Sequence, residues 1–118
     1  MRTVIVIYQK IGVLNMATTN EYIEYVCEQI EGVGEIRYKK MFGEFMVYVN
    51  DKPVIIVCNN VPFVKQLECI KDKMQNAEKG YPYKGAKEHY VLDIDNKGLC
   101  KSIVIELEKV TPLPKKKK

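Results

Sequence analysis

The side chains best suited to proton transfer or nucleophilic attack are the chain's one histidine and its one serine. His89 stands between Glu88 and Tyr90, at the start of a segment with strand-like alternation. An imidazole exchanges protons near neutral pH, but catalysis also needs a nucleophile and an orienting group beside it. Ser102 has no Gly-x-Ser-x-Gly turn around it. We therefore expect no catalytic residue, and a small enzyme that uses His89 is the third of three functional hypotheses.

Metal or redox chemistry would depend on the four cysteines. They are Cys27, Cys58, Cys69 and Cys100, at intervals of 31, 11 and 31 residues. No pair has the Cys-x-x-Cys spacing of a zinc knuckle or a redox motif, so we expect reduced thiols and no metal site. The sequence also lacks a Walker loop, a Gly-x-Gly-x-x-Gly turn and a helix-turn-helix signature. We accordingly expect no cofactor.

Lysines and tyrosines are interleaved around a glycine-rich loop. The lysines are Lys65, Lys84 and Lys87, and the tyrosines are Tyr81, Tyr83 and Tyr90. Such a set can bind single-stranded nucleic acid, because bases stack on the rings while ammonium groups meet phosphates. However, residues 16–114 hold 13 basic and 15 acidic side chains, a balance of −2, and the net +4 owes much to Lys115–Lys118. A nucleic-acid-associated module that uses this loop and the basic tail is therefore the second hypothesis.

Length and composition indicate one soluble domain. The chain has 118 residues, of which 47% are hydrophobic and 29% charged. No apolar run approaches the roughly 20 residues that cross a bilayer, and Thr3–Tyr8 lacks the cleavage site of a secretory signal. We expect a cytoplasmic protein without membrane contact. Residues 1–15 have no helix cap and no regular pattern, and we interpret them as an extension upstream of the true start; an added strand is the alternative.

The domain proper, predicted over residues 16–110, begins with a helix and ends with one. Thr18 and Glu21 have the spacing of a capping box, and the apolar residues that follow recur at helical intervals up to Gly32. This pattern predicts a helix over about residues 19–31. The last helix begins at Asp95 or Asn96 and presents one apolar face. Residues 111–118 are a tail rich in proline and lysine.

Apolar or alternating segments predict the strands of a sheet. They cover residues 35–40, 45–49, 54–58, 62–65 and 90–94. Asn50-Asp51 and Asn59-Asn60 suit tight turns between neighbouring strands. Residues 66–76 carry apolar side chains at helical spacing and predict a short helix, whereas the glycine and proline content of residues 80–87 predicts a loop. The order indicates a two-layer α+β domain, a mostly antiparallel sheet of about five strands with helices on one face.

Strand 45–49 is apolar on both of its sides. Phe45, Val47 and Val49 can face the helices, but Met46 and Tyr48 on the opposite side are apolar or amphipathic as well. One layer of helices covers one face, and a large exposed apolar patch usually marks an interface. We therefore expect a homodimer that buries the second face, unless residues 4–8 lie across it.

A Met-Phe-Gly corner joins the first two predicted strands. We expect Phe42 to be buried and Gly43 to sit in a turn or bulge. Neither these residues nor Met41 can abstract protons or bind a hard metal, so the corner is expected to pack rather than to bind a ligand. With its flanking strands, the corner resembles the signature of the N-terminal domain of the TfoX family, and the chain resembles a short stand-alone member.

The resemblance to the TfoX family spans roughly residues 18–110 and includes Phe63-Val64-Lys65 and the segment 82–87. It implies a two-layer α/β fold and a place among regulators of competence genes, whose complete members act as transcriptional coactivators alongside the cyclic-AMP receptor protein. The second, helical domain of those members has no counterpart in this sequence. Their usual pair of arginines is replaced by Lys39-Lys40, which loses bidentate geometry toward phosphate, and Glu44 stands where they often carry a glycine.

The first functional hypothesis is therefore a non-enzymatic regulatory or protein-interaction domain that forms a homodimer. The partner implied by the resemblance is the transcription machinery. The family motif falls on Met41, Phe42, Gly43 and Lys65. The candidate interaction residues are Lys39, Lys40, Met46, Tyr48, Tyr83, Lys84 and Lys87.

Overall fold

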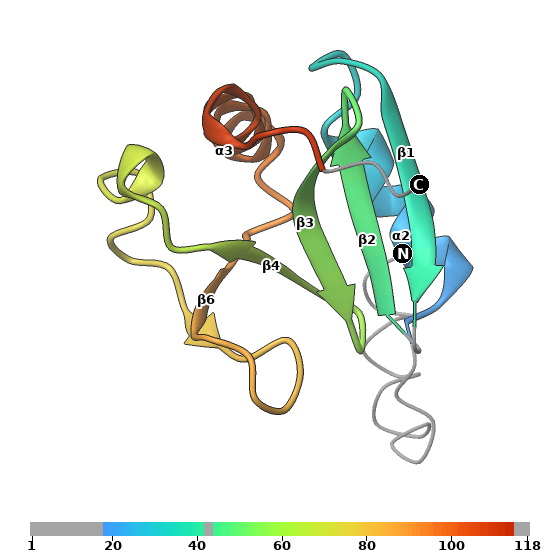
Figure 1. Ribbon diagram of the computed structural model, residues 1–118, viewed down its shortest axis with the longest axis horizontal. Coiled ribbons are helices and arrows are strands. Elements are labelled where there is room, and N and C mark those ends of the chain that lie inside the picture. Colours follow the sequence, from blue (N-terminus) through green and yellow to red (C-terminus); the bar gives the residue numbers. More distant parts are fainter. Residues whose placement is uncertain (1–17, 42–43, 115–118) are drawn as a thin grey trace.

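A computed structural model describes residues 18–41 and 44–114 of the protein (Figure 1). Its elements in chain order are α2 (Asn20–Gln29), β1 (Ile36–Met41), β2 (Glu44–Val49), β3 (Lys52–Cys58), β4 (Val61–Lys65), the 3₁₀ helix η1 (Glu68–Ile70), β5 (Lys79–Gly80), β6 (His89–Val91) and α3 (Lys97–Val110). The extension 1–15, Phe42 and Gly43 of the corner, and Lys115–Lys118 lie outside the described residues. What the sequence predicts for them stays a prediction.

The strands form one open sheet in which every pair is antiparallel. Their order is β1-β2-β3-β4-β6-β5. Figure 1 shows β1, β2 and β3 side by side with α2 behind β1 and β2, while β4 turns away toward β6. The α+β prediction is confirmed, but the described sheet has six strands where about five were expected. The extra strand β5 has two residues and reaches into the predicted loop, and two residues are too few to show a period.

Two tight turns set the register of the central strands. Asn50 and Asp51 have φ values of 52° and 68°, and Asn59 and Asn60 have φ values of 54° and 60°. Two consecutive residues at positive φ match the right-handed twist of a hairpin, and Asn and Asp tolerate this region better than other non-glycine residues. Both predicted turns are confirmed. A bulge at Val54 then shifts the pairing of β2 with β3 between Val47 and Tyr48.

Both predicted terminal helices form, but the cap of the first differs from the prediction. The side chain of Thr19, not Thr18, accepts from the N–H of Tyr22 at 3.1 Å and caps α2. Thr18 instead donates to the carbonyl of Val57 and accepts from the N–H of Asn60, which ties the start of the helix to β3 and its turn. Asn96 caps α3 as expected, because its side chain accepts from the N–H of Leu99.

The helix predicted over residues 66–76 is wrong as an α-helix. The structure has a single 3₁₀ turn, Glu68–Ile70, followed by turn residues up to Asn76. Ile70 and Met74 are nevertheless buried, so the helical spacing correctly identified the residues that face the core. Helix nucleation is costly over so short a segment. Turn hydrogen bonds, such as that of the Met74 N–H to the Ile70 carbonyl, and the burial of Ile70 and Met74 hold its irregular path.

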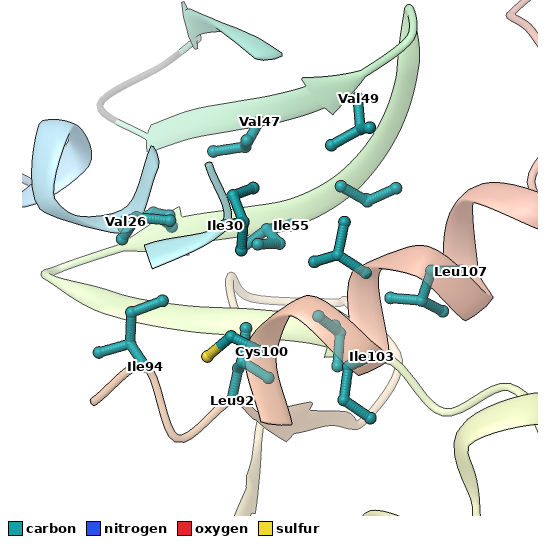
Figure 2. Packing of buried hydrophobic residues seen from close by; sticks show 14 of the residues in the cluster. Val26, Ile30, Val47, Val49, Ile55, Leu92, Ile94, Cys100, Ile103 and Leu107 are labelled. Atoms are coloured by element: carbon teal, nitrogen blue, oxygen red, sulfur yellow. The ribbon is translucent and has the colours of Figure 1, made fainter. Parts of the chain in front are cut away.

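One core lies between the sheet and the two helices. Phe45, Val47 and Val49 alternate with half-buried residues along β2 and belong to this core. Figure 2 shows Ile103 and Leu107 of α3 and Val26 of α2 close to Val47 and Ile55 of the sheet. Each of these side chains is at most 2% exposed, and burial of one such side chain stabilises the fold by about 1.5–3 kcal/mol. No helix within residues 18–41 and 44–114 is long and apolar enough to cross a membrane.

Candidate functional site on the open face of the sheet

A row of apolar side chains crosses the side of the sheet opposite the core. The register pairs Met46 of β2 with Ile56 of β3, Ile56 with Phe63 of β4, and Phe63 with Val91 of β6. None of the four belongs to the core cluster that the helices help to form. Three of them are half-buried, and Phe63 is 7% exposed. We call this row of four residues the open-face row.

Charged residues border the open-face row on β1. Lys39 lies opposite Met46, and Arg37 lies opposite Tyr48. The guanidinium of Arg37 stands 4.7 Å from the centre of the Tyr48 ring, and its Nε is 3.1 Å from Asp51 Oδ1. Arg37 and Asp51 are both exposed, so this ion pair adds little stability. The sequence placed Met46 and Tyr48 correctly on the second face, and the cation over Tyr48 puts that residue at the rim of the row.

A pocket of about 80 Å³ opens beside the row, where β3, β4 and β6 meet the end of α3. Its apolar walls include Met46, Ile56, Phe63 and Leu107. Its polar or charged lining consists of Lys65, His89 and Thr111. Lys65 and His89 both line the pocket because they are direct partners in the register of β4 and β6. Sequence reasoning named both residues but had no means to pair them.

His89 is held in place by its neighbours in this pocket. The residue is 9% exposed, and its Nδ1 lies 2.7 Å from the carbonyl oxygen of Lys87. A carbonyl only accepts, so Nδ1 carries a proton and donates it. The ring also meets Phe63 edge-on, with 6.4 Å between ring centres. Nε2 has no hydrogen-bond partner within the described residues. Every fully buried side-chain nitrogen in that part of the chain has a partner, so Nε2 is not fully buried and is open to solvent.

Comparison with other proteins gives one relative and no family model. No family model matches the chain. The uncharacterized 12.7 kDa protein of the trpE 5′ region in Spirochaeta aurantia is 36% identical over 78 residues, which are 66% of this chain and 68% of the relative. The chain belongs to the same family as this spirochaete protein. The name of that protein states a mass and a location beside a gene, and it assigns no activity to the family.

The two lysines before the corner, Lys39 and Lys40, lie on opposite faces of β1 in this member of the spirochaete protein's family. Lys39 lies opposite Met46 and therefore on the open face, whereas Lys40 lies opposite Phe45 and therefore on the core side of the edge strand. Both side chains are exposed. Successive strand residues point to opposite faces, so the two side chains leave β1 on opposite sides of the sheet. Met41 ends β1 half-buried, opposite Glu44.

The interleaved tyrosines and lysines separate into two groups. Tyr81 and Tyr83 are 58% and 49% exposed in the loop before β6, where Lys84 and Lys87 are exposed as well. Tyr90 is 7% exposed and belongs to the core. A sequence-based grouping of Tyr90 with the loop tyrosines is therefore wrong, because strand alternation turns Tyr90 inward while its neighbour His89 faces the pocket.

Three of the four cysteines are buried or half-buried in the fold, and the fourth is on the surface. Burial raises the pKa of the Cys27 thiol to about 11 and that of the Cys100 thiol to about 12. Burial, followed by the charge of Glu44, also raises the pKa of Cys58. Cys69 is exposed. No group of three potential metal ligands occurs within the part of the chain that the structure describes.

A second, larger hollow of about 700 Å³ lies between the turn residues 72–78 and the segment that leads into α3. Three aspartates line it together with other polar and apolar residues, among them Lys73 and Glu78; the aspartates are Asp72, Asp93 and Asp95. Tyr25 donates a short hydrogen bond to Asp95. Since these carboxylates do not gather into a cation site among the described residues, the hollow offers no recognisable chemistry. Ser102, on α3, lines neither hollow.

Proposed function

We propose that the protein is a non-enzymatic regulatory or protein-interaction domain that pairs with a second copy of itself through the open face of its sheet. The observation that supports this proposal is the open-face row, in which Met46, Ile56, Phe63 and Val91 present adjoining apolar side chains outside the core. The three half-buried members leave part of their apolar surface in water, and contiguous apolar surface outside a core favours an interface. The hydrophobic effect would drive its burial by roughly 25 cal/mol for each Å² removed from water.

A second copy is the occupant that the charges favour. Lys39 and Arg37 border the row on β1, and Glu44 stands at the start of β2 on the same face. Burial raises the pKa of the Glu44 carboxyl. A cation of the second copy placed against this carboxylate would offset the effect of burial. In a twofold dimer each copy offers the same patch, so both signs of charge must be present at its border for the contacts to match. This border has both.

The resemblance to the TfoX N-terminal domain gives the proposal its biological setting. The family motif residues Met41 and Lys65 lie at the ends of β1 and β4, within the sheet that carries the proposed interface. By this kinship the dimer would assist transcription of competence genes in the cytoplasm, with a component of the transcription machinery as its second partner.

The experiment that tests the proposal measures the mass of the protein in solution. Size-exclusion chromatography with light scattering should give about twice the 13.7 kDa of one chain. Met46→Lys should give the mass of a monomer, because a charge within the row is desolvated on pairing. Tyr48→Glu should do the same, because it replaces the ring at the rim of the row with a carboxylate that has lost the apolar surface of tyrosine. Ile105→Lys is the matched control, since Ile105 is 41% exposed on α3 and lies outside the open face.

A second candidate function is association with single-stranded nucleic acid. It is favoured by one observation, the exposure of Tyr81 and Tyr83 beside Lys84 and Lys87 in one loop. Exposed rings can stack on bases while nearby ammonium groups contact phosphates. Fluorescence anisotropy with a labelled oligonucleotide tests it, and a double change of Tyr81 and Tyr83 to Ala should abolish binding if the loop is the site.

A further inference from the structure

The pocket beside the open-face row differs from the rest of that face because it combines an apolar hollow with fixed polar groups. Lys65 lines its mouth and has no ion pair within the described residues. His89 is nine-tenths buried beside it, with Nδ1 engaged by the Lys87 carbonyl and Nε2 open to solvent. Hollows that are mainly apolar and have a few convergent polar groups are the usual form of small-molecule sites.

We propose that this pocket binds a small free carboxylate with a short apolar chain, such as propionate or butyrate. The chain would lie against Ile56 and Phe63, and the carboxylate would meet the ammonium group of Lys65 and the Nε2 side of His89. Nothing in this proposal requires the protein to be a dimer or to take part in transcription. It assigns a ligand to Lys65 and His89, which the proposed interface leaves unexplained, and the apolar wall of the pocket shares Ile56 and Phe63 with the open-face row.

The volume of the pocket limits the size of the ligand. A cavity of 150 Å³ in another protein holds a benzene molecule of six heavy atoms. The pocket here has about 80 Å³, so it takes about three heavy atoms and leaves the charged end of the ligand at the mouth, beside Lys65. A propyl or ethyl group meets this limit. A long fatty acid or an aromatic acid exceeds it.

The hydrogen bonding of His89 fixes which ring nitrogen can meet the ligand. Because Nδ1 already donates to a carbonyl, Nε2 is the atom available to a bound carboxylate, and it donates to that carboxylate when the ring carries both protons. The charged or titratable groups around the ring are Lys65 from β4 and Lys87 and Glu88 on its own segment; Glu88 lies 3.4 Å from the Gln66 amide, and β5 contributes Gly80 opposite the ring.

The test uses the full chain and the NMR signal of the imidazole C–H protons. These resonances are assigned without ambiguity, because the chain has one histidine. Butyrate should shift them in a saturable manner with a Kd on the order of millimolar. The matched probes are butanol, which has the chain without the charge, and inorganic phosphate, which has the charge without the chain. A response to either probe as strong as that to butyrate would overturn the proposal.

A pair of lysine variants locates the contact. Lys65→Met should weaken butyrate binding about fivefold, the upper end for an exposed ion pair. Lys87→Met is the matched control, because Lys87 adjoins His89 but its side chain does not line the pocket, and it should leave the affinity unchanged. Equal loss in both variants would mean that general charge attraction, and not the pocket, accounts for the shift.

The same titration identifies the source of the carboxylate. N-acetylglutamic acid amide carries a propionate-like side chain on a peptide backbone and stands in for an acidic residue of a partner protein. Butyrate should bind more tightly, because the pocket of about 80 Å³ takes its chain without a peptide backbone to place at the mouth. Tighter binding of the blocked glutamate would overturn the proposal of a free acid and assign the pocket to a side chain of another protein.

Discussion

Met46 on β2 and Ile56 on β3 lie directly opposite each other on the open face, while their neighbours Val47 and Ile55 pair on the core face. The sheet thus carries apolar partners on both of its sides over the same two strands. One side is covered by α2 and α3, and the other supports the proposed pairing with a second copy.

Thr18 should contribute to stability through the contacts that replace its expected role as a helix cap. Its hydroxyl bridges the Val57 carbonyl and the Asn60 N–H at 3.3 and 3.2 Å, and the residue is 8% exposed. Thr18→Val removes the hydroxyl at nearly constant volume and leaves both main-chain groups without this partner. The free energy of unfolding in urea should fall by about 1–3 kcal/mol. A loss below the error of the measurement would show that water replaces the hydroxyl.

Two substitutions of Asn59 should change the free energy of unfolding differently, because alanine and glycine differ in their preference for positive φ. Asn59 is exposed and has φ 54°, a region that costs most non-glycine residues roughly 1–2 kcal/mol. Asn59→Ala should therefore lower the free energy of unfolding by about 1 kcal/mol, whereas Asn59→Gly should leave it nearly unchanged or raise it. Thermal unfolding of both variants provides the comparison. The reverse order would contradict the conformation of this turn.

Much of this architecture could be predicted from the sequence, because the turns and helix caps are local. The asparagine pairs at 50–51 and 59–60 and the cap at Asn96 each act within a few residues, so their chemistry can be recognised in one dimension. The pocket could not be predicted in this way. Lys65 and His89 meet only because β6 pairs with β4 after a long irregular segment, and no period in the sequence encodes that pairing.

The bulge at Val54 shows a second limit of periodicity. Strict alternation groups Val54 with Ile56 and Cys58 on one side of β3, but Val54 and Ile55 are both buried. One extra residue in a strand moves the residues before it to the opposite face. The sequence showed that both faces of β3 are apolar, and it could not show which residue belongs to which face.

Alkylation should separate the exposed thiol from the buried ones. At pH 8 a thiol whose pKa is about 11 or 12, as for Cys27 and Cys100, is almost entirely protonated, and the thiolate is the reactive form. Iodoacetamide should therefore modify Cys69 first, and mass spectrometry of peptides would identify the site. Faster modification of Cys100 than of Cys69 would contradict the burial of Cys100.

The same thiols predict a loss of stability in alkaline solution. The folded pKa of Cys100 lies above its ordinary value of 9.0, so the unfolded chain releases this proton first as the pH rises. The stabilisation is complete below pH 9 and is lost progressively between about pH 9 and 12. Cys100→Ala should flatten the fall of the melting temperature over this range. An unchanged slope in this variant would contradict the assignment.

Removal of the basic tail should remove most attraction to polyanions. Residues 16–114 carry 13 basic and 15 acidic side chains, and non-specific nucleic-acid binding scales with the number of neutralised phosphates. A chain that ends at Pro114 should no longer be retained on heparin at physiological salt. Salt-sensitive binding of an oligonucleotide that survives this truncation would favour the loop at Tyr81 and Tyr83 as a nucleic-acid site.

The central claim is that the open face pairs with a second copy, and light scattering of the unmodified chain tests it most directly. At micromolar concentrations the mass should be about twice 13.7 kDa. Tyr48→Glu should halve it and leave the circular dichroism spectrum unchanged, while Ile105→Lys should leave the dimer intact. A well-folded unmodified chain that stays at 13.7 kDa throughout this range would contradict the claim.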